Sequence, residues 1–112
     1  MHDELIAIKG IKDGLLINLS TTEEWKSITA ELATHIDENV DFFAGANVTV
    51  DLGNRPVPKY ELSSLKALLE RRRLTLMVVL SDSDTTKQSA EALDLRTETG
   101  NPVPGREAQE TI

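Results

Sequence analysis

The sequence predicts a small α/β domain of the α+β-like kind, in which an opening β-hairpin is followed by the order α-β-α-β-α. Three observations predict this fold. An Asp-Gly pair separates two apolar runs near the start, two later segments carry apolar residues at helical spacing, and one segment is apolar almost throughout. We therefore expect a mixed sheet of four or five strands with about three helices.

The hairpin is predicted from residues 5–12 and 15–19, two strand-like runs around Asp13 and Gly14. Aspartate and glycine both tolerate positive φ, which the tight turn of a two-residue hairpin requires. The first two strands are therefore expected to pair antiparallel.

A helix over residues 22–37 is predicted next. A capping box, formed by Ser20 with Glu23 or by Thr21 with Glu24, is expected to satisfy the free amides of its first turn. Its apolar residues recur every three or four positions, which predicts one buried stripe. That stripe consists of Trp25, Ile28, Leu32 and Ile36.

The second half predicts a strand-helix-strand unit. Residues 39–46 are expected to form a connecting loop, residues 47–52 a strand, and residues 59–72 a helix. Residues 74–80 form a nearly continuous apolar run, which is typical of a central strand covered on both faces. The two strands should be parallel, joined by a right-handed crossover. The leucines expected to face inward are Leu62, Leu65, Leu68 and Leu69.

The predicted domain ends near residue 97. Asp84 or Ser83 can cap a last helix over residues 85–93, and a short fifth strand is predicted over 95–97. Residues 98–112 carry turn residues and no periodicity, so they are predicted to be a flexible linker or disordered tail. We divide the chain into a domain of residues 1–97 and this tail, which suggests that a second domain is missing.

Charge and composition exclude several classes of function. The net charge is −7, so binding to nucleic acid would require a local basic patch. The one basic run, residues 71–73, is better explained as cations at a helix C-terminus. The chain has no cysteine and no apolar run long enough to span a bilayer, and we expect a cytoplasmic protein that does not bind the membrane directly.

Residues suited to catalysis are few. His2 lies in the N-terminus and His35 lies late in a predicted helix, and neither has neighbours at the spacing of a triad or a metal site. The segment 81–84, Ser-Asp-Ser-Asp, follows a strand and precedes a helix, where it could hold magnesium. The same residues are those that cap a helix, so capping is the favoured interpretation. We expect no enzyme activity, no cofactor and no metal.

An interaction surface is the remaining hypothesis. Phe42 and Phe43 lie side by side, and either both pack in the core or one ring is exposed as a binding anchor. Lys9 and Lys12 have opposite parity on the first strand, where charges either discourage sheet pairing or contact a partner. Gly10 between them indicates a bulge or a place where another surface comes close.

The strings IKGIKDGLLINL, FFAGANVTVDLGNRP and ELSSLKALLERRRLTLMVVLSD resemble, in this order, the N-terminal domain of the bacterial septum-site protein family MinC. The resemblance extends from residue 5 to about residue 95. It rests on the order and spacing of the motifs, because no single motif is diagnostic.

The resemblance implies a protein that regulates the division site. Such domains bind the tubulin-like division GTPase FtsZ and inhibit or destabilise its filaments, which prevents septum formation at wrong sites. The partner MinD is expected only through the family's C-terminal domain, which is missing here. The implied partner-binding residues are Lys9, Gly10, Lys12, His35, Phe42 and Phe43.

One implied position departs from the family. The basic position late in the first helix is occupied by His35, and histidine is neutral for much of the time near pH 7. Lys12 is the candidate replacement for the missing positive charge.

Two other interpretations of the sequence imply functions different from division-site regulation. The element order is also similar to that of anti-sigma-antagonist (STAS-type) switch domains, whose phosphorylated serine lies in an Asp-Ser-x-Gly loop. Here residues 54–58 occupy that loop and contain no serine. A phosphatase or hydrolase using Asp82 and Asp84 is the other alternative.

Overall fold

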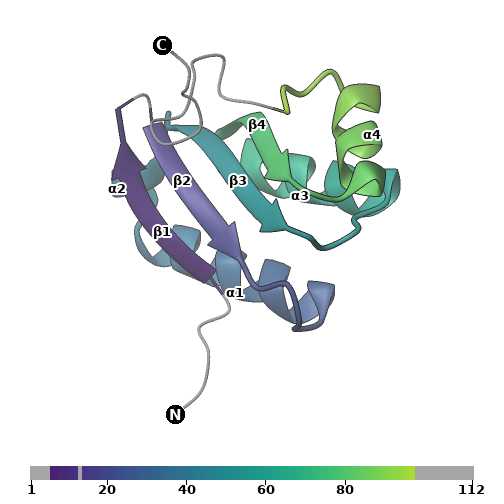
Figure 1. Cartoon of the computed structure of the whole chain (residues 1–112). Coiled ribbons are helices and arrows are strands. Elements are labelled where there is room, and N and C mark those ends of the chain that lie inside the picture. The colour runs from purple at the N-terminus through teal and green to yellow at the C-terminus, as the bar shows by residue number, and fades with distance from the viewer. Residues whose placement is uncertain (1–5, 13, 98–112) are drawn as a thin grey trace.

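The structure, a computed structural model, describes residues 6–12 and 14–97 (Figure 1). The predictions about His2, Leu5, Asp13 and the tail of residues 98–112 lie outside the described residues. Four strands form one sheet in the order β1-β2-β3-β4, and helices follow the strands along the chain. The predicted class, an α+β fold that opens with a hairpin and has a mixed sheet, is confirmed.

The hairpin consists of β1 (Ile6–Ile11) and β2 (Gly14–Leu19), which pair antiparallel as predicted. Gly14 is required where it lies. Its φ is +149°, and a Cβ atom there would approach the carbonyl oxygen of Asn47 to 2.1 Å. The start of β2 therefore touches the start of β3, which allows only a residue without a side chain.

Helix α1 spans Trp25–Glu38, so it begins three residues later than predicted. The predicted capping box is wrong. Ser20 Oγ accepts hydrogen bonds from the amides of Thr22 and Glu23 in a turn before the helix, whereas the N-cap residue Glu24 makes no side-chain cap bond. Three residues of the predicted stripe, Ile28, Leu32 and Ile36, are fully buried, whereas the fourth, Trp25, is only partly buried.

The segment predicted as a loop contains a one-turn helix, α2 (Val40–Phe43). The carbonyl of Asn39 holds this turn by accepting from the amides of Phe42 and Phe43. Four residues are too few to show a helical period in sequence, which explains the wrong prediction.

The remaining elements are β3 (Asn47–Gly53), α3 (Lys59–Glu70), β4 (Thr75–Ser81) and α4 (Asp84–Ala92). Strand β3 pairs parallel to both β2 and β4, which confirms the predicted parallel crossover. Ser83 caps α4 by accepting from the amide of Thr86. No helix in the described part of the chain is long and apolar enough to cross a bilayer.

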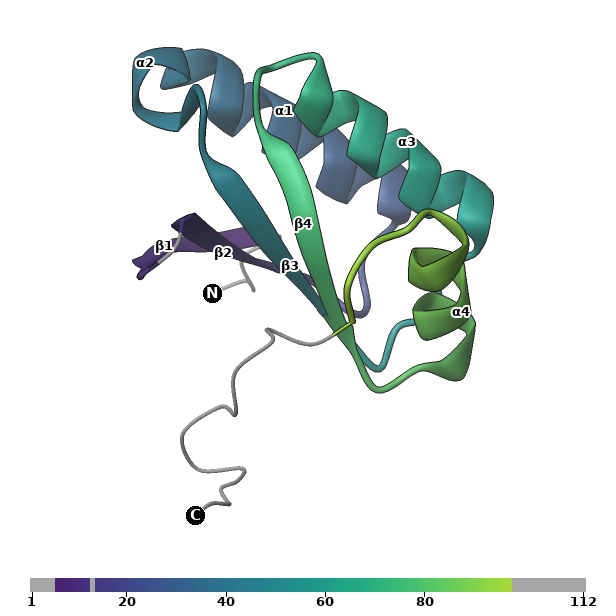
Figure 2. The same ribbon diagram turned by 90° about the horizontal axis from the view of Figure 1, so that it is seen from above.

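The prediction that β4 is a central strand is wrong. It lies at the end of the four-strand order, and within residues 6–12 and 14–97 its far edge carries only a single bridge, between Val78 and Arg96, in place of the expected fifth strand. Helices α1 and α3 cover one face of the sheet (Figure 2). The register shift at Met77 explains how an edge strand can be apolar nearly throughout. It interrupts the alternation of side chains, so the consecutive residues Val78 and Val79 are both buried.

The core lies between the sheet and helices α1 and α3. It is almost wholly aliphatic, with Phe43 as its one fully embedded ring. Thr86 and Ser89 on α4 are buried polar residues, and both hydroxyls bond the backbone of the loop before α3. These bonds fix α4 to that loop and satisfy groups that would otherwise be costly to bury.

Candidate protein-binding surface

Lys9 lies on the face of the sheet that α1 and α3 leave uncovered. In the hairpin register, Ile8 pairs with the core residue Ile17, and Lys9 pairs with Leu16. Because neighbouring side chains on a strand point to opposite faces, Lys9 points away from the core. Its side chain is exposed, so the ammonium group is accessible to a partner.

Gly10 pairs with Leu15 in a ladder without a register shift, so the bulge interpretation is wrong. The residue is exposed, and a Cβ atom placed there has no neighbour within 4 Å. The second interpretation, that a partner surface comes close at Gly10, stays a prediction. Lys12 follows β1 in the turn and is exposed as well.

The two phenylalanines of α2 have opposite environments. Phe43 is 5% exposed and belongs to the core, whereas Phe42 is 71% exposed. Their rings meet edge to face with centroids 5.0 Å apart. Successive helical residues point about 100° apart, and in α2 this directs one ring into the core and the other into solvent. Of the two predicted arrangements, the one with an exposed ring is the one observed.

His35 lies in the last turn of α1 and is half-exposed. Its Nε2 atom is 3.3 Å from a carboxylate oxygen of Glu31, one helical turn earlier. Protonation of this histidine would therefore form an ion pair with its own helix, which offsets the charge offered to a partner. Asn39 joins this end of α1 to α2 by donating to the His35 carbonyl.

The structure places the predicted residues in two groups on different layers. Lys9, Gly10 and Lys12 belong to the hairpin, whereas His35 and Phe42 belong to helices on the covered side of the sheet (Figure 2). Strand β1 is the edge strand of the sheet on the hairpin side. A partner that touches Lys9 and Phe42 together must therefore pass around the β1 edge.

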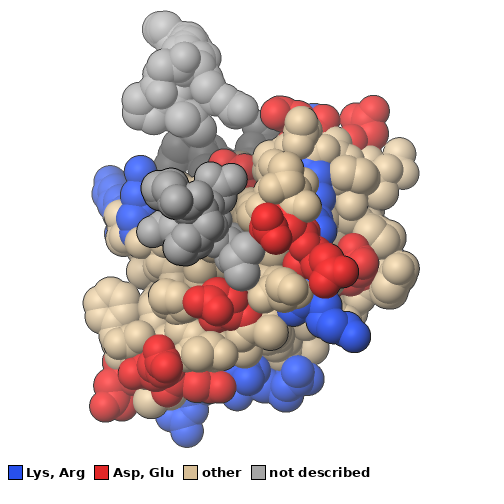
Figure 3. Space-filling view, turned by 90° about the horizontal axis from the view of Figure 1, so that it is seen from below, with Lys and Arg blue, Asp and Glu red and all other residues tan. Residues whose placement is uncertain are grey.

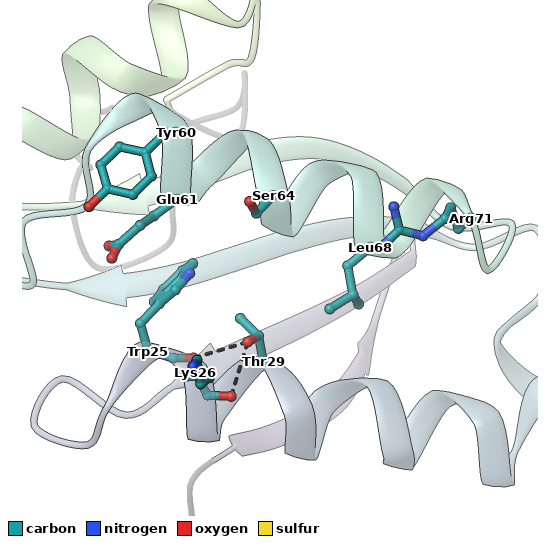
Figure 4. Close-up of a pocket in the computed structure, with 8 residues that line it drawn as sticks. All are labelled: Trp25, Lys26, Thr29, Tyr60, Glu61, Ser64, Leu68 and Arg71. Carbon is teal, nitrogen blue, oxygen red and sulfur yellow. Dashed lines mark hydrogen bonds between the residues drawn. The ribbon is translucent and has the colours of Figure 1, made fainter.

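Sequence reasoning missed a groove on the outer side of the helix layer, between α1 and α3 (Figure 4). The groove has a volume of about 380 Å³. Trp25 was expected in the buried stripe but is only partly buried, and Arg55 stacks over its ring at 5.5 Å. Tyr60, outside the leucine stripe, is 72% exposed. The lining residues are Trp25, Lys26, Thr29, Tyr60, Glu61, Ser64, Leu68 and Arg71.

Charges of both signs are interspersed over the face seen in Figure 3. The basic run at the end of α3 has structural contacts. Arg72 Nε lies 3.0 Å from a carboxylate oxygen of Asp37, and its guanidinium also donates to the carbonyl of Leu68. These bonds fit the interpretation of the run as cations at a helix C-terminus.

The segment with enzyme-like residues is engaged with the backbone. Ser81 Oγ donates to the carbonyl of Gly53 and accepts from the amide of Ser83, which in turn caps α4. Among the described residues, no three histidine or acidic side chains lie close enough together to hold a metal ion. The capping interpretation accounts for the hydroxyl groups of this segment.

The loop that would carry the phosphorylated serine of a STAS-type switch, residues 54–58, has no serine. Its backbone is tied to α4: Val57 donates to Thr86 Oγ1 at 2.8 Å, and Ser89 donates to the Val57 carbonyl at 2.7 Å. This geometry provides rigid support for the start of α3 rather than an accessible phosphorylation loop.

Comparison with known proteins identifies the family of the chain. Residues 6–76 match the family described as septum formation inhibitor MinC, N-terminal domain. The chain is 33% identical over 86 residues to a probable septum site-determining protein MinC of Heliobacterium modesticaldum, which is 77% of this chain and 30% of that protein. It is 30% identical over 71 residues to the corresponding protein of Pelotomaculum thermopropionicum, covering 63% and 33%.

The chain spans about a third of the length of these curated relatives. No solved structure matches the chain closely enough to add a comparison. The matched region runs from β1 into β4 and includes the hairpin, α2 and the groove. The chain therefore belongs to the MinC N-terminal domain family of septum formation inhibitors.

Proposed function

We propose that this chain regulates the site of cell division by binding FtsZ and inhibiting or destabilising its filaments. Membership of the MinC N-terminal domain family supports this function. The observation that carries the proposal is the exposed ring of Phe42, held out by α2 while its neighbour Phe43 anchors that helix in the core. An exposed aromatic ring on a rigid support is a typical anchor of a protein interface.

Positive charge completes the proposed binding site. The chain carries a net charge of −7, so an acidic partner such as FtsZ requires cations that are presented locally. Lys9 offers an exposed ammonium group on the uncovered sheet face, and Lys12 lies in the adjoining turn. A filament subunit seated around the β1 edge would contact both the lysines and Phe42.

The proposed mechanism is competition. A bound domain occupies surface that the next filament subunit needs, so longitudinal packing is lost and the polymer shortens or breaks. The domain acts by binding and not by catalysis, and the family's further domain would carry the contact with MinD. The setting is the cytoplasm, where FtsZ assembles.

Sedimentation of FtsZ polymer with the chain tests the proposal. Wild type should lower the amount of pelleted polymer, and Lys9→Glu and Phe42→Ala should each abolish most of that effect. Lys87→Glu, which reverses the same charge at an exposed position on α4, is the matched control and should behave as wild type. If both site variants still lower the pellet as wild type does, the proposed site is wrong.

A further inference from the structure

The groove between α1 and α3 is built by two helices that run in the same direction. In Figure 4, Trp25 and Glu61 lie at the end where both helices begin, and Leu68 and Arg71 lie toward the end of α3. Between these ends lie Ser64, which has a short side chain, and Leu68, which is only partly buried. Its lining residues carry both signs of charge, with Lys26 and Arg71 against Glu61.

The α3 side of this groove is complementary to itself. Its lining positions 61, 64, 68 and 71 are spaced three, four and three apart, so they form one helical face. When two such faces meet antiparallel, position 61 of one helix lies opposite 71 of the other, and 64 lies opposite 68. This pairing places Glu61 against Arg71 twice and Ser64 against Leu68 twice, charge against countercharge and small against large.

We propose that the α1–α3 face binds a second copy of this chain, through antiparallel packing of α3 on α3 about a two-fold axis. In a two-fold interface every contact occurs twice. When Glu61 of one copy contacts Arg71 of the other, Arg71 of the first copy also contacts Glu61 of the second, as this pairing requires. A partner of a single charge would leave one sign of the groove unmatched. A second copy carries both signs in the reversed order.

The size of the face predicts weak association. Helices of 14 and 12 residues are about 20 Å long, and two of them side by side cover roughly 400 Å² per copy, or about 800 Å² in total. That total is below the roughly 1,200 Å² at which stable interfaces begin. The dimer is therefore transient, depends on concentration, and weakens as salt screens its charge pairs.

Charge exchange across the interface provides the test. Sedimentation velocity of the 112-residue chain is measured from about 10 µM to about 1 mM, the range of weak complexes. The single tryptophan, Trp25, lines the groove, so its emission is a second readout of the same equilibrium. The variants are Glu61→Arg and Arg71→Glu, and Glu91→Arg on α4 is a control with the same net charge as the first.

Wild type and Glu91→Arg should associate over this range. Each groove variant alone should associate roughly tenfold or more weakly, because like charges then meet twice across the two-fold axis. An equimolar mixture of Glu61→Arg and Arg71→Glu should recover association, since every Arg at position 61 then faces a Glu at position 71.

Three results would each overturn the proposal: a monomeric wild type at the highest concentration, a control that loses association as Glu61→Arg does, or a mixture that fails to recover it. Circular dichroism of each variant verifies that the fold is intact. The proposal is independent of filament inhibition, because no FtsZ is present in the measurement.

Discussion

Replacing Phe42 and Phe43 one at a time should separate binding from stability. Phe43 is 5% exposed and belongs to the aliphatic core, so Phe43→Ala removes a buried ring and leaves a cavity. Such a truncation costs about 3–5 kcal/mol in the free energy of unfolding. For a domain of this size, that loss lowers the melting temperature by more than about 12 °C.

Phe42→Ala should be much milder. Its ring is 71% exposed, and the main contact that it loses is the edge-to-face contact with Phe43 at 5.0 Å. Aromatic pairs of this geometry contribute about 0.5–1.5 kcal/mol. We therefore expect a loss of about 1 kcal/mol, with the variant fully folded at room temperature.

Urea denaturation followed by Trp25 emission and by circular dichroism measures both free energies. The filament pelleting assay is then run on the folded variants. Phe42→Ala should retain its fold and lose inhibition of the polymer, whereas Phe43→Ala should lose stability first. Equal destabilisation by the two substitutions would refute the assignment of one ring to the core and the other to a binding surface.

Three further predictions concern the support of the fold. Thr86→Val removes a fully buried hydroxyl that bonds two backbone groups, so it should lower the free energy of unfolding by about 2–4 kcal/mol, measured by urea denaturation. The control Thr85→Val, at the exposed neighbouring position, should lower it by less than about 0.5 kcal/mol. Gly14→Ala should lower the free energy of unfolding by well over about 1 kcal/mol, because the new Cβ atom would clash with the backbone of Asn47. Gly10→Ala should lower it by less than about 1 kcal/mol, because a Cβ atom there has no neighbour within 4 Å, and similar melting temperatures for the two variants would contradict this reasoning. Arg73→Gly should raise the free energy of unfolding by about 0.5–1 kcal/mol, because φ is +69° at that residue, and a lowered stability would count against strain there.

The parts of the fold that follow a local rule were predicted from the sequence. The Asp-Gly turn between apolar runs predicted the hairpin, and apolar spacing predicted the buried faces of α1 and α3 except for Trp25 and Leu68, which are only partly buried. Ser83, one of two predicted caps, is the observed cap of α4. Each of these features is decided by neighbouring residues, so periodicity and turn chemistry were sufficient.

The features that depend on distant contacts were not predicted. An apolar run is the same in sequence whether the strand is central or, as β4, lies at the end of the sheet with a register shift at Met77. Ser20 does accept backbone hydrogen bonds as a capping residue would, but it accepts them in a turn that precedes the start of α1. Spacing also tells which face of a helix is apolar but not how far apart two helices lie, so the groove beside Trp25 was missed.

The candidate site was only partly accessible to sequence reasoning. The sequence allowed two arrangements of the phenylalanine pair, and the structure has the one in which Phe43 is buried and Phe42 is exposed on the one-turn helix α2. The separation of Lys9 from Phe42 onto two layers could not be read from the sequence, since it depends on how the hairpin and α2 meet the sheet. The partner-binding roles of these residues stay predictions.

The most direct test of the proposed function is the amount of FtsZ polymer that pellets as the chain is titrated against a fixed amount of FtsZ and GTP. Wild type should lower the pelleted polymer progressively with concentration, and Lys9→Glu at equal concentration should leave most of it in the pellet. Polymer that pellets undiminished at a several-fold excess of folded wild-type chain would contradict the proposal that this domain inhibits FtsZ filaments.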